Sequence, residues 1–355
     1  MTDGQPRGDV LPEDRETISL AASGTSATAA ATGVHTLPEE PGRAHHDVAV
    51  DYEAGVELEA RSQWAYVRMR FFRHRLAVAS IVVLIALTLV ALLASRIAPY
   101  RYDELDLTKI SSPPTLEGHH WFGTDLLGRD YLSRVIYGTR TSLLIAFLVA
   151  FVSTAIGTAL GSVAGYYGGH VDNLLMRFTD LILTLPILAV LLATAAFLGA
   201  GDLKIGPFTF PQPVKIGLII ALLVWTSVAR IVRGLFLSLR EKEFVEAAKA
   251  AGASDLRIIL RHILPNCVGP IVVFMTLITV VAILLEAALS FLGFGIQPPF
   301  PALGKLIAEG QAEGFESWWL VTFPGLVIVL ICLAINFIGD GLRDALDPTQ
   351  RRVRA

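Results

Sequence analysis

The sequence predicts an all-α membrane protein with six transmembrane helices and a disordered amino-terminal tail. Of its 355 residues, 53% are hydrophobic and only 17% are charged, whereas soluble domains carry about 25% charged residues. Several apolar runs are long enough to cross the roughly 30 Å of bilayer hydrocarbon, which takes about 20 helical residues. The chain is therefore expected to lie in lipid.

Residues 1–60 are predicted to form an acidic, disordered, cytosolic tail. They hold 12 acidic and 3 basic side chains, a net charge of −9, so residues 61–355 carry about +6 to reach the total of −3. The stretch 21–33 is almost entirely Ala, Ser, Thr and Gly, and such composition cannot bury a core. An acidic start without an apolar h-region is not a signal peptide. A regulatory role is the alternative to a merely solvated tail.

Residues 61–75 are predicted to be an interfacial segment that leads into the first transmembrane helix, 76–98. Aromatic rings and arginines alternate here, a mixture that suits the headgroup level, where rings bury and charges stay hydrated. The residues are Trp64, Tyr66, Phe71 and Phe72, with Arg68, Arg70, Arg73 and Arg75.

Six apolar runs account for the predicted transmembrane helices. The run 216–229 is uncharged for only fourteen residues, but the apolar sequence continues through Arg230 and Arg233 to Leu239, and these arginines can snorkel to an interface. Between the first two helices, 99–140 is expected to be an external loop carrying an amphipathic helix over 122–136. The runs are 76–95, 141–169, 181–201, 216–229, 263–285 and 317–339.

Positive charges in the short loops predict the orientation. The segment between the fourth and fifth helices holds five basic residues, whereas the loop 291–316 holds only Lys305. The first is therefore expected in the cytosol and the second outside. An even number of helices then places both termini in the cytosol, including the tail 343–355.

Four glycines recur at every fourth position of the second predicted helix. Gly157, Gly161, Gly165 and Gly169 would line one helical face with the smallest possible side chain. Such a face lets another helix approach closely. We interpret it as a packing surface and not as a substrate site.

The segment 241–266 reads as two short helices around a turn. Residues 243–251 are strong helix formers, Gly252 can take the left-handed conformation that ends a helix, and Ser254 can cap the next. Asp255 suits the positive start of that second helix and Arg257 lies toward its negative end, and Pro265 is expected to stop the helix. From the residues alone, this polar projection is either a docking surface or a solvated connector.

The same segment resembles the EAA loop of binding-protein-dependent ABC importers. The resemblance rests on Glu246-Ala-Ala, then Gly252, then Ile263-Leu-Pro265, although His262 stands where the family often has an aliphatic residue. It implies that the loop fits a groove on an ATPase subunit. The implied coupling residues are Glu246, Ala247, Ala248, Gly252, Ser254, Asp255, Arg257, Ile263, Leu264 and Pro265.

Three further stretches resemble the C-type permease subunit of the dipeptide/oligopeptide/nickel importer family. They are 120–130, 288–295 and 336–348, and the resemblance covers about 65–350. It implies the type I ABC importer permease fold, with a five-helix core over 141–342, in a bacterial cytoplasmic membrane. The helix over 122–136 would brace the second transmembrane helix or contact the binding protein.

The resemblance also implies partners. These are a second permease subunit, two P-loop ATPase subunits and an external solute-binding protein, besides membrane lipid and without nucleic acid. No Gly-x-x-x-x-Gly-Lys-Ser/Thr run occurs in the sequence, so ATP and Mg²⁺ are expected on partner chains. No catalytic, metal or cofactor site is expected in this one. Peptides are the expected solute, with nickel chelates or glutathione as alternatives.

Two acidic residues at membrane depth need an explanation, because each costs about 2.5 to 3.5 kcal/mol on insertion. Asp180 begins the third predicted helix and is expected at an interface. Glu286 follows 23 uncharged residues and could face the pathway, meet a partner helix or mark the external end of its helix. The alternative function from another class is a proton-coupled secondary transporter that uses one of these carboxyl groups, although no internal repeat supports it.

Overall fold

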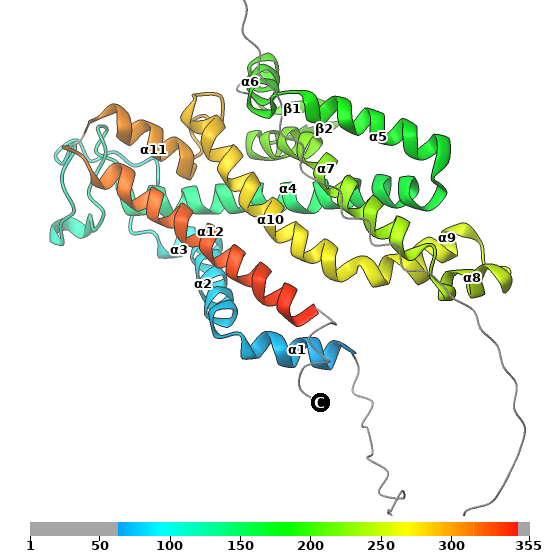
Figure 1. Cartoon of the computed structure of the whole chain (residues 1–355). Helices are drawn as coiled ribbons and strands as arrows, with labels where there is room; N and C mark the ends of the chain where they lie inside the picture. Colours follow the sequence, from blue (N-terminus) through cyan, green and yellow to red (C-terminus); the bar gives the residue numbers. More distant parts are fainter. Residues whose placement is uncertain (1–62, 200, 315, 347–355) are drawn as a thin grey trace, which may run out of the picture. The chain divides into compact units, whose positions relative to one another are not determined.

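The computed structural model describes residues 63–199, 201–314 and 316–346, and these are mostly helical (Figure 1). The predicted tail 1–60, and residues 347–355 of the predicted tail 343–355, lie outside the described residues, whereas 343–346 belong to the last helix. The α-helices are α1 (Gln63–Arg73), α2 (Arg75–Leu92), α3 (Ala94–Ile97), α4 (Tyr131–Tyr167), α5 (Gly169–Thr184), α6 (Ile187–Leu198), α7 (Gln212–Leu239), α8 (Glu243–Ala250), α9 (Asp255–Arg257), α10 (Leu264–Phe291), α11 (Leu303–Ala312) and α12 (Trp319–Leu346). A 3-10 turn η1 (Glu117–His119), a π-helical turn η2 (Ile258–Ile263) and the strands β1 (Leu203–Ile205) and β2 (Phe208–Phe210) complete the described elements.

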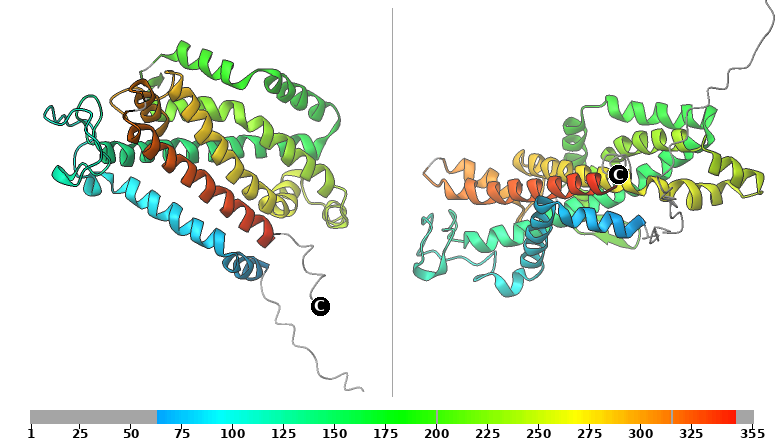
Figure 2. Two further views of the ribbon diagram at one scale, coloured as in Figure 1. Left: turned by 60° about the vertical axis from the view of Figure 1, so that its left-hand side comes forward. Right: turned by 60° about the horizontal axis from the view of Figure 1, so that its bottom comes forward.

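Within the part of the chain that the structure describes, five helices are long and apolar enough to cross a membrane, which confirms the predicted all-α membrane fold. They are α2, α4, α7, α12 and the continuous helix Asp255–Phe291, which joins α9, η2 and α10. In the two views of Figure 2 these long helices form one bundle, with α2 beside α12. The predicted first helix, 76–98, corresponds to α2 and the short α3.

The predicted third helix, 181–201, is wrong as a continuous element. The chain breaks at Leu185 and Pro186, and the flanking α5 and α6 are bent by 83°, so they form at most one broken span. Proline restricts the residue before it to extended conformations, and Leu185 has φ −77° and ψ 136°. The apolar run predicts that the segment lies in lipid but not that it is bent, and the bend follows from the single proline Pro186.

The predicted amphipathic helix 122–136 is also wrong in its first half. Residues 122–130 are irregular and contain an isolated antiparallel bridge between Thr124 and Asp130. Helix α4 begins at Tyr131 because Asp130 caps it, accepting a 2.8 Å hydrogen bond from the backbone N–H of Ser133. The loop therefore leads directly into α4.

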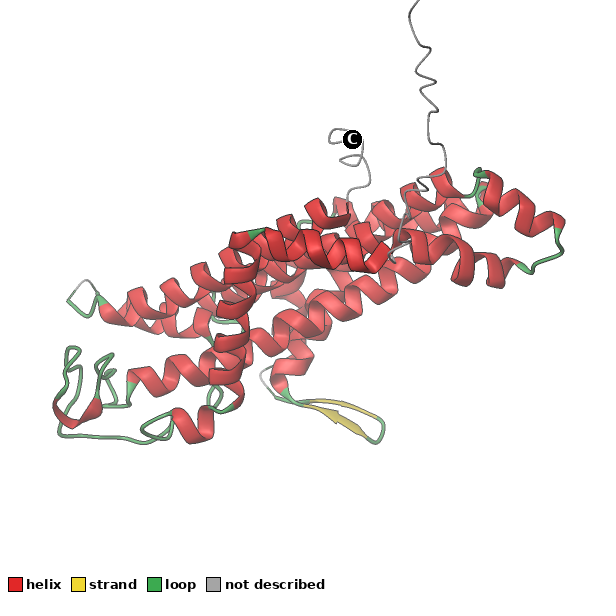
Figure 3. Ribbon diagram, turned by 90° about the horizontal axis from the view of Figure 1, so that it is seen from below, coloured by secondary structure: helices red, strands yellow, loops and turns green. Residues whose placement is uncertain are grey.

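The two ends of the helix bundle carry different elements. Helices α8 and α9 project at one end, called the α8 end below, while α11 and the loop before α4 lie at the other, the α11 end (Figure 1). The antiparallel hairpin β1–β2, with Leu203 opposite Phe210, projects beside the loops (Figure 3). Helix α1 packs on α12, where Phe71 is buried next to Gly341.

Candidate functional site

The turn between α8 and α9 has the geometry that the sequence predicts. Gly252 has φ +78°, and its N–H donates to the Lys249 carbonyl at 2.9 Å while the Ala253 N–H donates to the Ala248 carbonyl at 3.0 Å. This pattern closes a helix through a left-handed residue. Ser254 precedes α9 in an extended conformation, as expected of a cap, but its side chain makes no capping hydrogen bond.

The expectation that Pro265 stops a helix is wrong. The helix runs unbroken through it, from Asp255 to Phe291, because the chain widens into the π-helical turn just before Pro265. A widened turn tolerates the missing N–H and the bulk of the ring. The side-chain amide of Asn266 donates to the His262 carbonyl at 2.6 Å and so satisfies one carbonyl of that turn.

Buried aliphatic side chains fix the segment 241–266 to the bundle. Val245, Ile258 and Ile263 are fully buried. The hydroxyl group of Tyr166, at the end of α4, donates a 2.7 Å hydrogen bond to the Asp255 carboxylate, and the Lys249 ammonium lies 5.8 Å from the centre of the Tyr166 ring. The projection is therefore held rigidly and is not a loose connector.

The opposite side of the segment is accessible and partly apolar. Phe244, Leu256 and Leu260 are 39%, 65% and 52% exposed. Exposed apolar groups on a polar projection are typical of a docking surface. Of the predicted coupling residues, Glu246, Ala247, Gly252, Ser254, Asp255, Arg257 and Pro265 are exposed, Ala248 and Leu264 are half-buried, and Ile263 is buried.

Three of the four repeated glycines of α4 lie against α7. A methyl group on Gly157 would lie 2.5 Å from the Val228 Cβ atom, one on Gly161 2.5 Å from the Ala229 carbonyl oxygen, and one on Gly165 2.5 Å from the Phe236 Cβ atom. Only glycine permits this approach. The fourth is a correction: Gly169 faces open space, and with φ +55° it belongs, with Gly168, to the turn between α4 and α5.

The arginines of α7 bind carboxylates of α5. Arg230 lies 2.5 Å from the exposed Asp180, and Arg233 donates two hydrogen bonds to the buried Asp172, one of 2.6 Å. Sequence reasoning missed Asp172 and expected the arginines to snorkel. No spacing marked these partners in the sequence, because the two arginines lie three residues apart on α7 whereas Asp172 and Asp180 lie eight residues apart on α5.

The motif of residues 120–130 forms a polar bracket at the α11 end. Asp125 is buried, and its carboxylate accepts hydrogen bonds from Arg129 at 2.7 Å and from Arg134 of α4 at 2.6 Å. Arg134 also lies 2.8 Å from Glu309 of α11. The bracket thus joins the loop, α4 and α11 through paired charges.

The pKa values of two carboxyl groups near this bracket are shifted. The hydroxyl and N–H groups of Thr108 donate to Asp106 and lower the pKa of that carboxyl, although the side chain is exposed. Burial raises the pKa of Glu313, which follows α11. His120 is buried, with its Nδ1 atom 3.0 Å from Asp130. These are structural contacts within the bracket.

Glu286 is fully buried inside this chain, between α4 and α10. Its carboxyl oxygens accept hydrogen bonds from the hydroxyl groups of Ser142 and Ser290. Neither oxygen is open to a solute in this conformation. Asp180, in contrast, is exposed on α5 and paired with Arg230.

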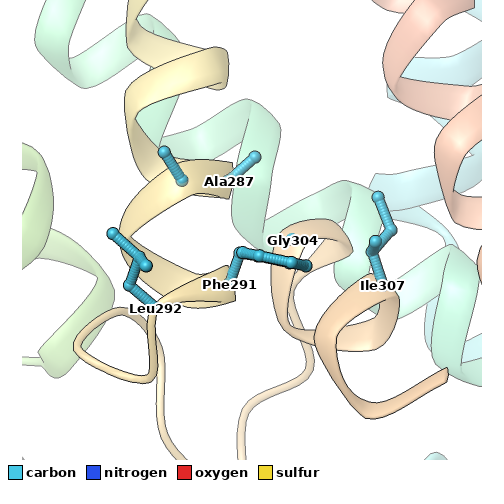
Figure 4. Close-up of a pocket in the computed structure, with 6 residues that line it drawn as sticks. Ala287, Phe291, Leu292, Gly304 and Ile307 are labelled. Carbon is cyan, nitrogen blue, oxygen red and sulfur yellow. The ribbon is translucent and has the colours of Figure 1, made fainter. Parts of the chain in front are cut away.

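A hollow of about 330 Å³ lies between the last turn of α10 and α11 (Figure 4). All of its lining residues are apolar: Ala287, Ala288, Phe291, Leu292, Gly304 and Ile307.

The described helices define a multi-pass membrane protein with a helical projection at one end. The chain belongs to the family of binding-protein-dependent transport system inner membrane components, which matches residues 157–352. A second family description, the N-terminal TM domain of oligopeptide transport permease C, matches residues 62–114. The resemblance that the motifs indicated is thereby confirmed.

Curated relatives cover nearly the same region. The oligopeptide transport system permease protein OppC of Escherichia coli strain K12 is 43% identical over 301 residues, 85% of this chain and 96% of that protein. OppC of Mycobacterium tuberculosis strain H37Rv is 39% identical over 297 residues, 83% and 98%. Among solved structures, an inward-facing MetNI methionine ABC transporter chain matches 61% of this chain and 97% of its own, with a TM-score of 0.45 and 17% identity.

Proposed function

We propose that this chain is the permease subunit of an ATP-driven importer for dipeptides or oligopeptides, acting with a second permease, two P-loop ATPases and a solute-binding protein. The continuous helix from Asp255 to Phe291 carries the proposal, because one rigid element connects the docking projection with the opposite end of the bundle. The names of the relatives support peptides as the solute. Nickel chelates and glutathione are the alternative solutes.

The proposed mechanism is transmission of an ATPase movement along this helix. The segment 241–266 would fit a groove on one ATPase through its exposed apolar and acidic residues, among them Phe244, Glu246 and Leu256. ATP and Mg²⁺ would bind to the ATPases, whose closure would displace the projection. Since Val245 and Tyr166 hold the projection on the bundle, the displacement would tilt the helices and alternate access to a central pathway.

This arrangement fixes the proposed orientation. A projection that meets an ATPase lies in the cytosol, so the α8 end would be cytosolic and the α11 end external. The arginines that precede α2 and those in the segment 241–266 agree with this orientation, because basic loops remain on the cytosolic side. Both termini would then be cytosolic, and the type I importer arrangement would apply.

The experiment is purification of the tagged chain from gently solubilised membranes, identification of its companions and reconstitution into proteoliposomes with labelled peptides. We expect a second permease and P-loop ATPases to copurify, and uptake to need ATP and the binding protein. Competition by glutathione or a nickel chelate, with no effect of excess peptide, would assign one of the other solutes. Uptake by the chain alone under a proton gradient would overturn the importer proposal in favour of a secondary transporter.

A further inference from the structure

The carboxyl group of Glu286 is the shared acceptor of a buried hydrogen-bond network at the α11 end of α10. The Ser142 hydroxyl of α4 donates to its Oε2 atom at 2.9 Å, and the Ser290 hydroxyl, one turn further along α10, donates to its Oε1 atom at 2.8 Å. All three side chains are at most 1% exposed. Because a buried carboxyl needs such donors, the two serines are committed to it.

The same two hydroxyl groups hold the connection 292–302 between α10 and α11. The backbone N–H of Leu303 donates to the Ser142 Oγ atom, and the N–H of Ile296 donates to the Ser290 Oγ atom, both at 3.3 Å. A hydroxyl that donates its proton to Glu286 turns its lone pairs toward these N–H groups. Through these two hydroxyl groups, Glu286 therefore orients the contacts at Ile296, within the connection, and at Leu303, directly after it.

A third hydrogen bond fixes the middle of the connection to another helix. The Gln297 N–H donates to the Oε1 atom of Gln212, the first residue of α7, at 3.1 Å. The anchors thus lie on α4, α7 and α10. There is little slack, since a methyl group on Gly304 would lie 2.4 Å from the Ala287 Cα atom. Since Ser142 belongs to α4, a movement of α10 against α4 either breaks the Ser142–Glu286 hydrogen bond or carries Ser142 along, and with it the bonded Leu303 N–H.

The apolar hollow beside this network provides room for such a movement. Glu286 directly precedes Ala287 in its wall, and Gly304 and Ile307 of α11 form the facing side (Figure 4). The side chains that line the hollow are apolar and form no hydrogen bonds, so a small shift of α11 against α10 breaks none of theirs. The hydrogen bonds of Glu286 then determine how α11 follows α10.

We propose that Glu286 is a positioning residue for transport, which acts through Ser142 and Ser290 to make the connection 292–302 and α11 follow the movement of α10. This inference rests on the proposed function, since that movement begins at the α8 end where the ATPases would dock. It assigns to Glu286 no contact with the solute, because both carboxyl oxygens are occupied and the side chain is fully buried.

The test uses the complete complex in proteoliposomes and two substitutions of similar size. Glu286→Leu removes both acceptors, and an aliphatic residue is favourable in a membrane helix. Glu286→Gln keeps one carbonyl acceptor and can donate to the second serine. A reporter, Phe300→Cys, lies on the connection and is 40% exposed. It is introduced after Cys267 and Cys332, the two cysteines of the sequence, are replaced by alanine.

Two quantities are measured for each variant: ATP-dependent peptide uptake, and the rate at which an impermeant maleimide labels the reporter with and without ATP and vanadate. In the unsubstituted complex the labelling rate should depend on nucleotide. Glu286→Leu should abolish that dependence and reduce uptake about tenfold, while ATPase subunits still copurify and hydrolyse ATP. Glu286→Gln should restore both quantities to within about threefold.

Three results would overturn the inference. In the first, Glu286→Leu supports normal uptake with nucleotide-dependent labelling. In the second, Glu286→Gln fails as fully as Glu286→Leu in an assembled complex, which would assign the role to the carboxyl proton itself. If Glu286→Leu does not assemble, the double substitution of Ser142 and Ser290 by alanine decides, and normal uptake there is the third. Absence of ATP-dependent uptake in the unsubstituted complex would instead remove the proposed function.

Discussion

Arg233 of α7 and Asp172 of α5 form a two-pronged ion pair across 61 positions of sequence, with both carboxylate oxygens engaged by the guanidinium group. The carboxylate is 11% exposed and the guanidinium group 34%. One helical turn away, Arg230 and Asp180 form a second pair, in which both side chains are more than half exposed. Two pairs of the same chemistry on the same two helices thus differ mainly in burial.

The difference in burial predicts unequal costs of substitution. Asp172→Asn removes a charged partner from a partly buried guanidinium group and should destabilise the protein by roughly 1.5 to 3 kcal/mol. Asp180→Asn is the matched control and should cost less than about 1 kcal/mol, because exposed pairs are screened. The thermal midpoint of the detergent-solubilised protein measures both. Equal midpoints for the two variants would show that the Asp172 pair does not stabilise α5 against α7.

The approach of α4 to α7 predicts a second contrast. A methyl group on Gly161 would lie 2.5 Å from the Ala229 carbonyl oxygen and 2.9 Å from the Val232 Cβ atom. Gly161→Ala should therefore separate the helices and cost about 1 to 3 kcal/mol. On α7, Gly234 has open space around it, so Gly234→Ala should stabilise slightly through its helix propensity. Thermal unfolding tests the pair, and a midpoint unchanged by Gly161→Ala would contradict the packing role.

Glu313 predicts a pH dependence of stability at the α11 end. Burial raises its pKa in the folded protein above the ordinary 4.5, so the folded state binds more protons than the unfolded state just above that pH. Its contribution to stability is thus complete below pH 4.5 and is lost as pH rises through the raised pKa. Asp106 acts in the opposite direction, but only as pH falls below its ordinary 3.8.

The expected result is a thermal midpoint that falls as pH rises above 4.5, and a smaller fall in Glu313→Gln. The control is Glu316→Gln, because Glu316 is an exposed carboxyl three residues away. Its midpoint should follow the unsubstituted protein over the same pH range. Identical slopes in the protein and in Glu313→Gln would assign the pH dependence to another group.

The features that sequence reasoning placed correctly are local. The apolar runs predicted the long helices. Gly252 and Ser254 predicted the turn between α8 and α9, because the ending of a helix depends on a few adjacent residues. The glycine repeat predicted a close helix neighbour but not that it is α7. Gly169 shared the spacing of the repeat, yet it lies in a turn.

The features it missed depend on distant contacts or on one residue within a uniform run. The Asp125–Arg134 and Asp172–Arg233 pairs join different elements, and no periodicity marks them. Pro186 lies within an apolar run whose hydropathy hides the 83° bend. Pro265 is the opposite case. It is expected from the sequence to end a helix, but the helix widens into a π-helical turn just before it and accommodates the proline. The sequence singles out Glu286 because a carboxyl group costs free energy in lipid, but only the fold shows that Ser142 and Ser290 donate hydrogen bonds to it.

The last prediction concerns Gly252, where the effect of a substitution on the stability of this chain can be separated from its effect on the binding of a partner. Its φ of +78° disfavours other residues by about 1 to 2 kcal/mol, yet an added side chain would meet nothing within 4 Å of its Cβ position. Gly252→Ala and Gly252→Leu should therefore cost this chain about the same stability. Gly252→Asn should cost less, because asparagine adopts the left-handed conformation more readily.

An ATPase groove around the turn would distinguish alanine from leucine, whereas this chain alone would not. We expect equal thermal midpoints for the two variants, but at least about tenfold less ATPase recovered with Gly252→Leu than with Gly252→Ala, which corresponds to about 1.4 kcal/mol of lost binding. Quantitative mass spectrometry of the purified complexes measures this. If both variants recover the same amount of ATPase and support the same peptide uptake, the turn at Gly252 lies outside the interface, and the docking surface must be sought among the exposed residues of α8.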